Sequence, residues 1–122
     1  MNVIWPYCVS RFSHAITVAE GSDPDWNNPG DMTISLGFRT VGVANAAGVL
    51  KFAQWIDGEY VLCHQCYLML SGKSEIYSLS MTLAQAGLKY SGGDPNWAKN
   101  AAAVLDLPVT ATLYAVSQLK AV

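Results

Sequence analysis

The 122-residue sequence has little charge and no basic region. Asp, Glu, Lys and Arg make up 13% of the chain, whereas an average soluble domain has roughly 25%. Seven basic residues stand against nine acidic ones, so the net charge is −2 at pH 7, and no stretch concentrates either sign. A protein that binds a phosphate backbone needs clustered Lys and Arg, so we expect no nucleic-acid partner.

Cysteine is also scarce, and its number is odd. Cys8, Cys63 and Cys66 are the only cysteines, which argues against a disulfide-stapled scaffold. Cys63 and Cys66 have a C-x-x-C spacing beside His64, but a zinc site needs a fourth ligand and a thioredoxin-like site needs a preceding strand. We therefore interpret these cysteines as buried apolar residues and expect no metal and no cofactor.

Long hydrophobic runs are missing, although 52% of the residues are apolar. No window approaches eighteen consecutive apolar residues, so we expect no stable membrane insertion. The first residues, MNVIWPYCVSRFSHA, lack the basic and long apolar regions of a secretory signal peptide. The apolar content and the length predict one folded domain over residues 1–122.

The first half of the chain predicts one helix, one loop and one hairpin. Apolar residues recur at spacings of three and four from Val9 to Glu20, which predicts a helix capped by Ser10 and ended by Gly21. The following segment, GSDPDWNNPGD, has the composition of a loop. Residues Met32 to Phe38 and Val49 to Trp55 predict the two strands of a small hairpin.

The second half predicts four helices separated by turn signals. Capping residues, Pro at a first helical position and Gly after a last one mark the boundaries. The expected helices run from Asp57 as cap to Leu70 with Gly72 as stop, from Ser80 or Thr82 to about Tyr90, from Asp94 as cap to about Leu105, and from Thr110 to Leu119. The predicted fold class is mainly α, or α+β, with one small hairpin.

Glu20 is the one acidic residue of the first predicted helix. At a helix C-terminus the macrodipole disfavours negative charge, and Trp26 in the next loop would desolvate the carboxyl further. Both effects raise the pKa of Glu20 and favour the protonated form that a general acid needs in glycoside cleavage. The alternative is an ordinary solvent-exposed glutamate.

Aromatic side chains suit a saccharide groove beside such an acid. The candidates are Trp26, Tyr77, Tyr90 and Trp97. For Tyr90 and Trp97, packing in the core is an equally good interpretation.

The chain resembles phage and bacterial proteins of the lysozyme-like superfamily in three blocks: AITVAEGSDPDWNNPGDMT, VLKFAQWIDGEYVLCHQCYLMLSGKSEIYSLSMTL and KYSGGDPNWAKNAAAVL. Members of this family have AEG followed by NNPG and Asp or Asn, a helix that ends in ML-x-G-x-S, and a Y-x-G-G-D/N-x-x-x-W element. The resemblance covers roughly residues 12 to 107. The sequence departs from the pattern at Cys63 and Cys66, where aliphatic residues are usual, and at Asp106, which replaces a Gly.

The resemblance implies a lysozyme-like helical domain in which Glu20 is the acid and base that cuts the β-1,4 bond between MurNAc and GlcNAc in peptidoglycan. It also implies that glycan strands are the partner. The implied substrate-binding residues, with Trp26 added from its place beside Glu20, are Trp26, Asn27, Asn28, Tyr77, Thr82, Tyr90 and Trp97. For Asn27 and Asn28, shaping the loop is the alternative role.

Two mechanisms and a second class of function stay open. Asp23, Asp25 and Asp31 are close enough in sequence to supply a second carboxylate, and without one a single-glutamate scheme remains. In that scheme we favour a lytic transglycosylase over a muramidase. The alternative is a non-catalytic module that binds glycan or builds a virion. Without a signal peptide, a phage-associated location or release to the cell wall or periplasm is expected.

Overall fold

Five α-helices, one short 3₁₀-helix and a two-stranded antiparallel sheet form the computed structural model, which describes residues 3–121. The elements are α1 (Tyr7–Glu20), η1 (Pro24–Trp26), β1 (Thr40–Val43), β2 (Leu50–Phe52), α2 (Trp55–Leu70), α3 (Leu83–Ser91), α4 (Pro95–Leu105) and α5 (Leu113–Ser117). The predicted class, mainly helical with one small hairpin, is confirmed.

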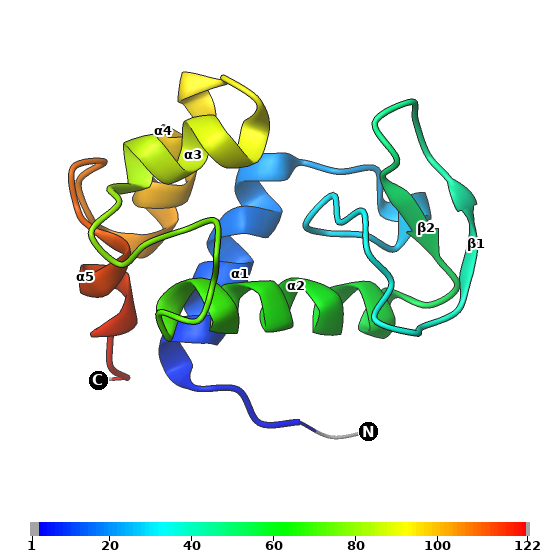
Figure 1. The fold of residues 1–122 in the computed structure, drawn as a ribbon, viewed down its shortest axis with the longest axis horizontal. Coiled ribbons are helices and arrows are strands. Elements are labelled where there is room, and N and C mark those ends of the chain that lie inside the picture. Colours follow the sequence, from blue (N-terminus) through cyan, green and yellow to red (C-terminus); the bar gives the residue numbers. More distant parts are fainter. Residues whose placement is uncertain (1–2, 122) are drawn as a thin grey trace.

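The helices pack around α1 and leave the hairpin at one side (Figure 1). Helix α1 contacts α4 and α2, and α3 lies against α4. The hairpin lies beyond the N-terminal end of α2, and the loop that follows α1 runs towards it (Figure 1). Within residues 3–121, no helix combines the length and the hydropathy needed to cross a membrane.

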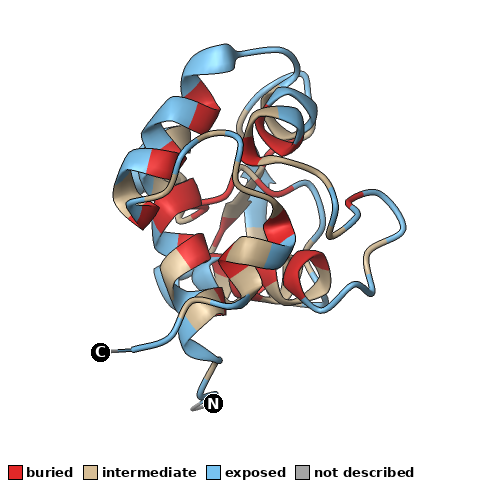
Figure 2. Ribbon diagram, turned by 90° about the vertical axis from the view of Figure 1, so that its left-hand side faces the viewer, coloured by how far each residue is buried: buried red, intermediate tan, exposed pale blue. Residues whose placement is uncertain are grey.

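The main core lies where all five helices meet. Its largest fully buried side chains include Phe12, Ile16, Met69, Leu83 and Trp97, and Figure 2 shows the buried residues on the inward faces of the helices. A second, smaller cluster of Met32, Phe52 and Val61 joins the hairpin region to α2.

The cysteines belong to this core as expected. Cys63 is 5% exposed and Cys66 is fully buried on α2, and both are free thiols, as is the half-buried Cys8. Burial raises the pKa of both thiols on α2 above the usual range, so they stay protonated and inert.

The predicted caps of the first two long helices are wrong. Helix α1 begins at Tyr7 after Pro6, and Ser10 lies in its first turn, where its backbone N–H donates to the Pro6 carbonyl at 3.1 Å. Proline suits this place because its ring fixes φ and it has no N–H to satisfy. Helix α2 begins after Gln54, so Asp57 lies in the first turn, where its charge complements the helix dipole.

The caps of the next helices are confirmed. Thr82 and Gln85 form a reciprocal capping box at the start of α3, with N···O distances of 3.1 and 2.9 Å. Asp94 caps α4 by accepting from the backbone of Asn96 at 2.9 Å. Asp106 ends α4 in the left-handed conformation, at φ 55°, a place where Gly is the commonest residue in proteins. Helix α5 is shorter than the predicted Thr110 to Leu119.

The first predicted strand is wrong and the second is confirmed in part. Residues Met32 to Phe38 form no strand, because Leu36 and Gly37 adopt φ values of 49° and 83° and turn the chain. The pairing strand is β1, which follows this turn and joins β2 within the predicted Val49 to Trp55 segment.

Candidate functional site

Glu20 is the last residue of α1, and its side chain is half-buried. Gly21 ends the helix in the left-handed conformation, at φ 57°, and returns its N–H to the Thr17 carbonyl. The indole Nε1–H of Trp97 on α4 donates to Oε1 of Glu20 at 3.0 Å. Because α1 and α4 pack closely and Trp97 is only 2% exposed, one oxygen of the carboxyl is held in a fixed place.

A second carboxylate, Asp31, lies close enough to Glu20 to raise its pKa. It comes from the loop after η1, where its backbone adopts φ 51°. The hydroxyl of Ser22 donates to Oδ1 of Asp31. Of the three aspartates considered from the sequence, the structure brings this one to Glu20, whereas Asp23 caps η1 through the backbone of the exposed Asp25.

Burial and the neighbouring carboxylate raise the pKa of Glu20 to about 8. Desolvation is the largest cause, the hydrogen bond and the charge of Asp31 add to it, and the charge of Asp94 adds a little. The Trp97 N–H acts in the opposite direction because it stabilises the carboxylate. The predicted rise in the pKa and its predicted cause, desolvation, are confirmed. Asp31 adds a contribution that was not predicted from the sequence.

Three aromatic rings contact one another in a row that ends at Glu20. Ring centroids are 6.4 Å apart between Tyr77 and Tyr90, and 5.2 Å apart between Tyr90 and Trp97. The Tyr90 hydroxyl donates to the Gly30 carbonyl at 2.7 Å, which ties α3 to the loop that carries Asp31. Burial raises the pKa of Tyr77 to about 12 and that of Tyr90 well above its usual value, so both phenols are neutral.

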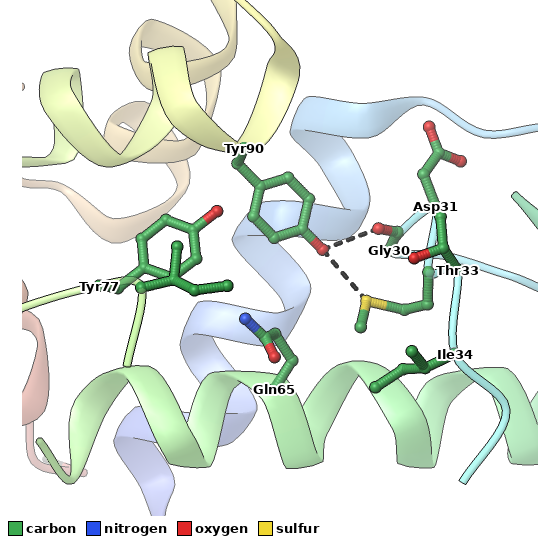
Figure 3. Close-up of a pocket in the computed structure, with 9 residues that line it drawn as sticks. Gly30, Asp31, Thr33, Ile34, Gln65, Tyr77 and Tyr90 are labelled. Atoms are coloured by element: carbon green, nitrogen blue, oxygen red, sulfur yellow. Dashed lines mark hydrogen bonds between the residues drawn. The ribbon is translucent and has the colours of Figure 1, made fainter. Parts of the chain in front are cut away.

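A pocket of about 330 Å³, here called the main pocket, opens beside these rings (Figure 3). Asp31, Thr33, Gln65, Tyr77 and Tyr90 contribute its polar lining groups. Gln65 comes from α2 and Tyr90 from α3, so the pocket lies between two helices and the loop (Figure 3). The pocket therefore combines ring edges with amide, hydroxyl and carboxyl groups.

A second pocket of about 420 Å³ shares Ile76 and Tyr77 with the main pocket and extends to Gly72 and Met81. The two pockets are therefore adjacent, and together they are here called the furrow. Glu20 does not line either pocket and instead lies next to Asp31, which lines the main one.

The structure separates the predicted site residues into two groups. Tyr77 and Tyr90 line the main pocket, and Trp97 touches Glu20. Trp97 is 2% exposed and its indole N–H contacts Glu20, which favours the core-packing alternative over a direct contact with substrate. Trp26 ends η1, half-buried and outside both pockets, and Thr82 uses its hydroxyl as the cap of α3.

The two asparagines of the NNPG motif shape the loop. Asn28 is fully buried, its amide nitrogen donates to the carbonyls of Met32 and Leu50 at 2.9 and 2.8 Å, and its oxygen accepts from the Met32 N–H at 2.9 Å. Asn27 donates to the Phe52 carbonyl at 3.0 Å. Because Asn28 is fully buried and both polar atoms of its amide bind the backbone of the loop and of β2, the structure favours the alternative role of shaping the loop.

Sequence reasoning missed several residues that line the main pocket. Gln65 was hidden inside the C-x-x-C motif, and Thr33 and Ile34 were assigned to a strand. Ile34 and Ile76 are 49% and 61% exposed on the rim of the main pocket. The one signal in the sequence that could have placed Ile76 at the site is its position next to Tyr77. Ser22 carried no signal, because its contact with Asp31 depends on how the loop folds back.

Comparisons with family models, with curated proteins and with solved structures each found no match to this chain. Within the described residues, no group of three or more His, Cys, Asp or Glu side chains is arranged to hold a metal ion.

Replacing Glu20 with Gln should make stability less dependent on pH. The folded state keeps a proton on Glu20 up to about pH 8, whereas an unfolded Glu loses it near about pH 4.3. Between these values the folded state binds more protons, so its free energy of unfolding falls as the pH rises. Allowing for solvent screening at a half-buried site, we expect Glu20→Gln to be more stable than the wild type by about 1–2 kcal/mol at pH 8.

Urea unfolding of both proteins at about pH 4 and about pH 8 measures this difference. We expect near-equal stability of the two proteins at the acid end, where Glu20 is protonated in the folded and the unfolded state. A difference that stayed constant across the range would show that Glu20 titrates normally.

Proposed function

We propose that this protein cleaves the β-1,4 bond between MurNAc and GlcNAc in peptidoglycan glycan strands, with Glu20 as the acid and then the base. The observation that carries the proposal is a carboxyl that is kept protonated at neutral pH beside a furrow with aromatic and polar walls. Protonated carboxyls of this kind donate to the leaving oxygen in glycoside cleavage.

The lining of the furrow supports a sugar ligand. Tyr77 and Tyr90 offer ring surface at the main pocket, and Gln65 and Thr33 offer hydrogen bonds next to it. The choice of peptidoglycan rests on the sequence resemblance to lysozyme-like proteins, which includes Glu20 at the end of its helix.

Asp31 is too close to Glu20 to act from the opposite side of a sugar. Retaining enzymes place their carboxyls about 5–5.5 Å apart and inverting enzymes about 6.5–9.5 Å apart, on either side of the sugar, whereas Asp31 lies beside Glu20 and raises its pKa. A single-glutamate scheme therefore fits best. Glu20 protonates the bridging oxygen as the bond to the sugar C1 breaks, and its carboxylate then removes a proton from the attacking hydroxyl.

The attacking hydroxyl decides between two reactions. If it is the 6-hydroxyl of the same MurNAc, the product is a 1,6-anhydro sugar and the protein is a lytic transglycosylase. If it belongs to water, the protein is a muramidase. We favour the transglycosylase, because the carboxylate that lines the main pocket, Asp31, lies on the same side as Glu20 and raises its pKa.

One observation favours a second candidate, a non-catalytic module that binds glycan or forms part of a virion. Glu20 itself does not line the furrow, and Trp97 already holds one of its oxygens. A binding module would keep the furrow and never move the proton. In either case the site of action would be the bacterial cell wall or a phage particle.

Mass analysis of the sugars released from purified peptidoglycan separates these proposals. Anhydro ends support the transglycosylase, and reducing ends support the muramidase. Release of neither product, together with sedimentation of the protein with the insoluble glycan, would replace both enzymes with the binding module.

A further inference from the structure

Gln65 is a polar side chain on an otherwise apolar face of α2. It lies one turn after Leu62 and one turn before Met69, and both of these side chains are fully buried in the core. Gln65 itself is half-buried and lines the main pocket. Within the described residues, its side-chain amide makes no hydrogen bond to another side chain or to the backbone. The fold leaves this amide unused, so it is open to a ligand in the pocket.

Apolar side chains stand beside the Gln65 amide. Met32, Ile34 and Ile76 line the same pocket. Figure 3 shows Gln65 projecting from α2 into the pocket, with Tyr77 on one side and Ile34 on the other. The pocket therefore offers a hydrogen-bonding amide next to an apolar wall.

The charge of the main pocket disfavours an anionic ligand group. Among the described residues that line it, Asp31 supplies a carboxylate, and there is no Lys, Arg or His. Tyr77 and Tyr90 are neutral, because burial raises the pKa of both phenols. A carboxylate or phosphate of a ligand would meet Asp31 with no cation to balance the two charges. The group that Gln65 binds is therefore neutral.

We infer that Gln65 recognises the 2-acetamido group of an N-acetylated sugar and thereby selects such glycans over those with a hydroxyl at C2. This inference rests on the proposed function, because it names the sugar group that the furrow selects. The acetamido group is neutral and combines a carbonyl with a methyl group. The amide nitrogen of Gln65 donates to the acetyl oxygen, and the methyl group lies against Met32 and Ile34. A hydroxyl at C2 is shorter, so it leaves both the amide and the apolar wall without a partner.

The fold arranges the amide and the apolar wall before any ligand binds. Gly30 packs against α2 one turn before Gln65, where an added Cβ would lie 2.7 Å from a Leu62 methyl carbon. The Tyr90 hydroxyl donates to the Gly30 carbonyl at 2.7 Å and lies 3.4 Å from the Met32 sulfur. Met32 and Gln65 are thus held in fixed positions relative to each other, which lowers the entropic cost of binding.

Chitotetraose and cellotetraose test the inference, because these β-1,4 tetrasaccharides differ only in having an acetamido group or a hydroxyl at C2. We expect the wild type to bind chitotetraose at least about tenfold more tightly, since one hydrogen bond and one buried methyl group are gained. Titration followed by ¹H–¹⁵N NMR measures both affinities. The chain has four glutamines, and the side-chain NH₂ signals of Gln65 are identified by their absence in Gln65→Met. We expect these signals to move with chitotetraose and not with cellotetraose.

Gln65→Met removes the hydrogen-bonding atoms and keeps an unbranched side chain that suits the apolar neighbours on α2. We expect it to bind chitotetraose about fivefold more weakly or worse, and cellotetraose within about twofold of the wild type. A purely structural role would weaken the binding of both sugars alike. Gln65→Glu keeps an acceptor but loses the donor, so we expect it to lose at least as much affinity for chitotetraose.

Gln54→Met is the matched control for these variants. Gln54 is exposed, makes no side-chain cap bond at the start of α2 and lies outside both pockets. Its preference for chitotetraose should equal that of the wild type. Urea unfolding shows that each variant is folded.

Three results would overturn the inference: equal affinity of the wild type for the two sugars, binding of neither sugar, or an undiminished preference in Gln65→Met. Sugar release from peptidoglycan tests the proposed function separately. A protein that releases no sugar but prefers chitotetraose through Gln65 would contradict the proposed cleavage and support the inference. A protein that cleaves peptidoglycan with no such preference would support the cleavage and contradict the inference.

Discussion

Glu20→Gln is expected to lower the rate of peptidoglycan cleavage by about 10²–10⁴-fold, the usual contribution of a general acid. Gln fills the same space and can still accept the Trp97 N–H that now reaches Glu20, so the loss comes from the missing proton. Because the furrow is unchanged, binding to insoluble glycan should persist. The assay compares initial rates of sugar release at about pH 6, where Glu20 is protonated.

Glu59→Gln is the matched control for this loss. Glu59 is an exposed residue of α2, and Gln keeps the acceptor for the Trp55 N–H at 3.2 Å. Its rate should equal that of the wild type. A Glu20→Gln protein that cleaved as fast as this control would remove Glu20 from the mechanism.

Gly58→Ala is expected to destabilise the protein by about 2–3 kcal/mol, in the range of overpacked cores. The loop that carries the NNPG motif crosses α2 at this glycine, and an added Cβ would lie 1.9 Å from the Asn27 carbonyl oxygen and 2.9 Å from its carbon. Both are backbone atoms, so the loop has to move. The gain of about 1 kcal/mol that Ala brings to a helix offsets only part of this strain.

Thermal and urea unfolding measure the effect, with Ile56→Ala as control. Ile56 is also on α2 but is 60% exposed, so its truncation should change stability by less than about 0.5 kcal/mol. A Gly58→Ala protein as stable as this control would mean that the loop does not lie against α2. We also expect the displaced loop to weaken cleavage, because Asp31 lies four residues after Asn27.

Local signals explain which parts of the fold could be predicted. The stop at Gly21, the Thr82 box and the Asp94-Pro95 start depend on neighbours in sequence, and all three are confirmed. The prediction of a strand over Met32 to Phe38 was wrong. It was based on the β-branched residues of this segment, whereas tertiary hydrogen bonds determine its conformation. In these bonds the buried amide of Asn28 binds the backbone of the loop and of β2.

The candidate site also has a part that local signals predict and a part that depends on tertiary contacts. The position of Glu20 at the end of α1 could be predicted, since a helix pattern and a stop residue fix it. The partners of its carboxyl could not, because Trp97 is 77 residues away along the chain. Asp31 was one of three equivalent aspartates until the loop folded back over α2.

Sugar release by the wild type as a function of pH is the decisive test of Glu20 as the general acid. Purified peptidoglycan is digested from about pH 4 to about pH 9, a range that brackets the raised carboxyl. We expect cleavage at neutral pH, and we expect it to be lost as the pH rises through about 8, where Glu20 gives up its proton. No release at any pH, or release that continues undiminished above that value, would contradict it.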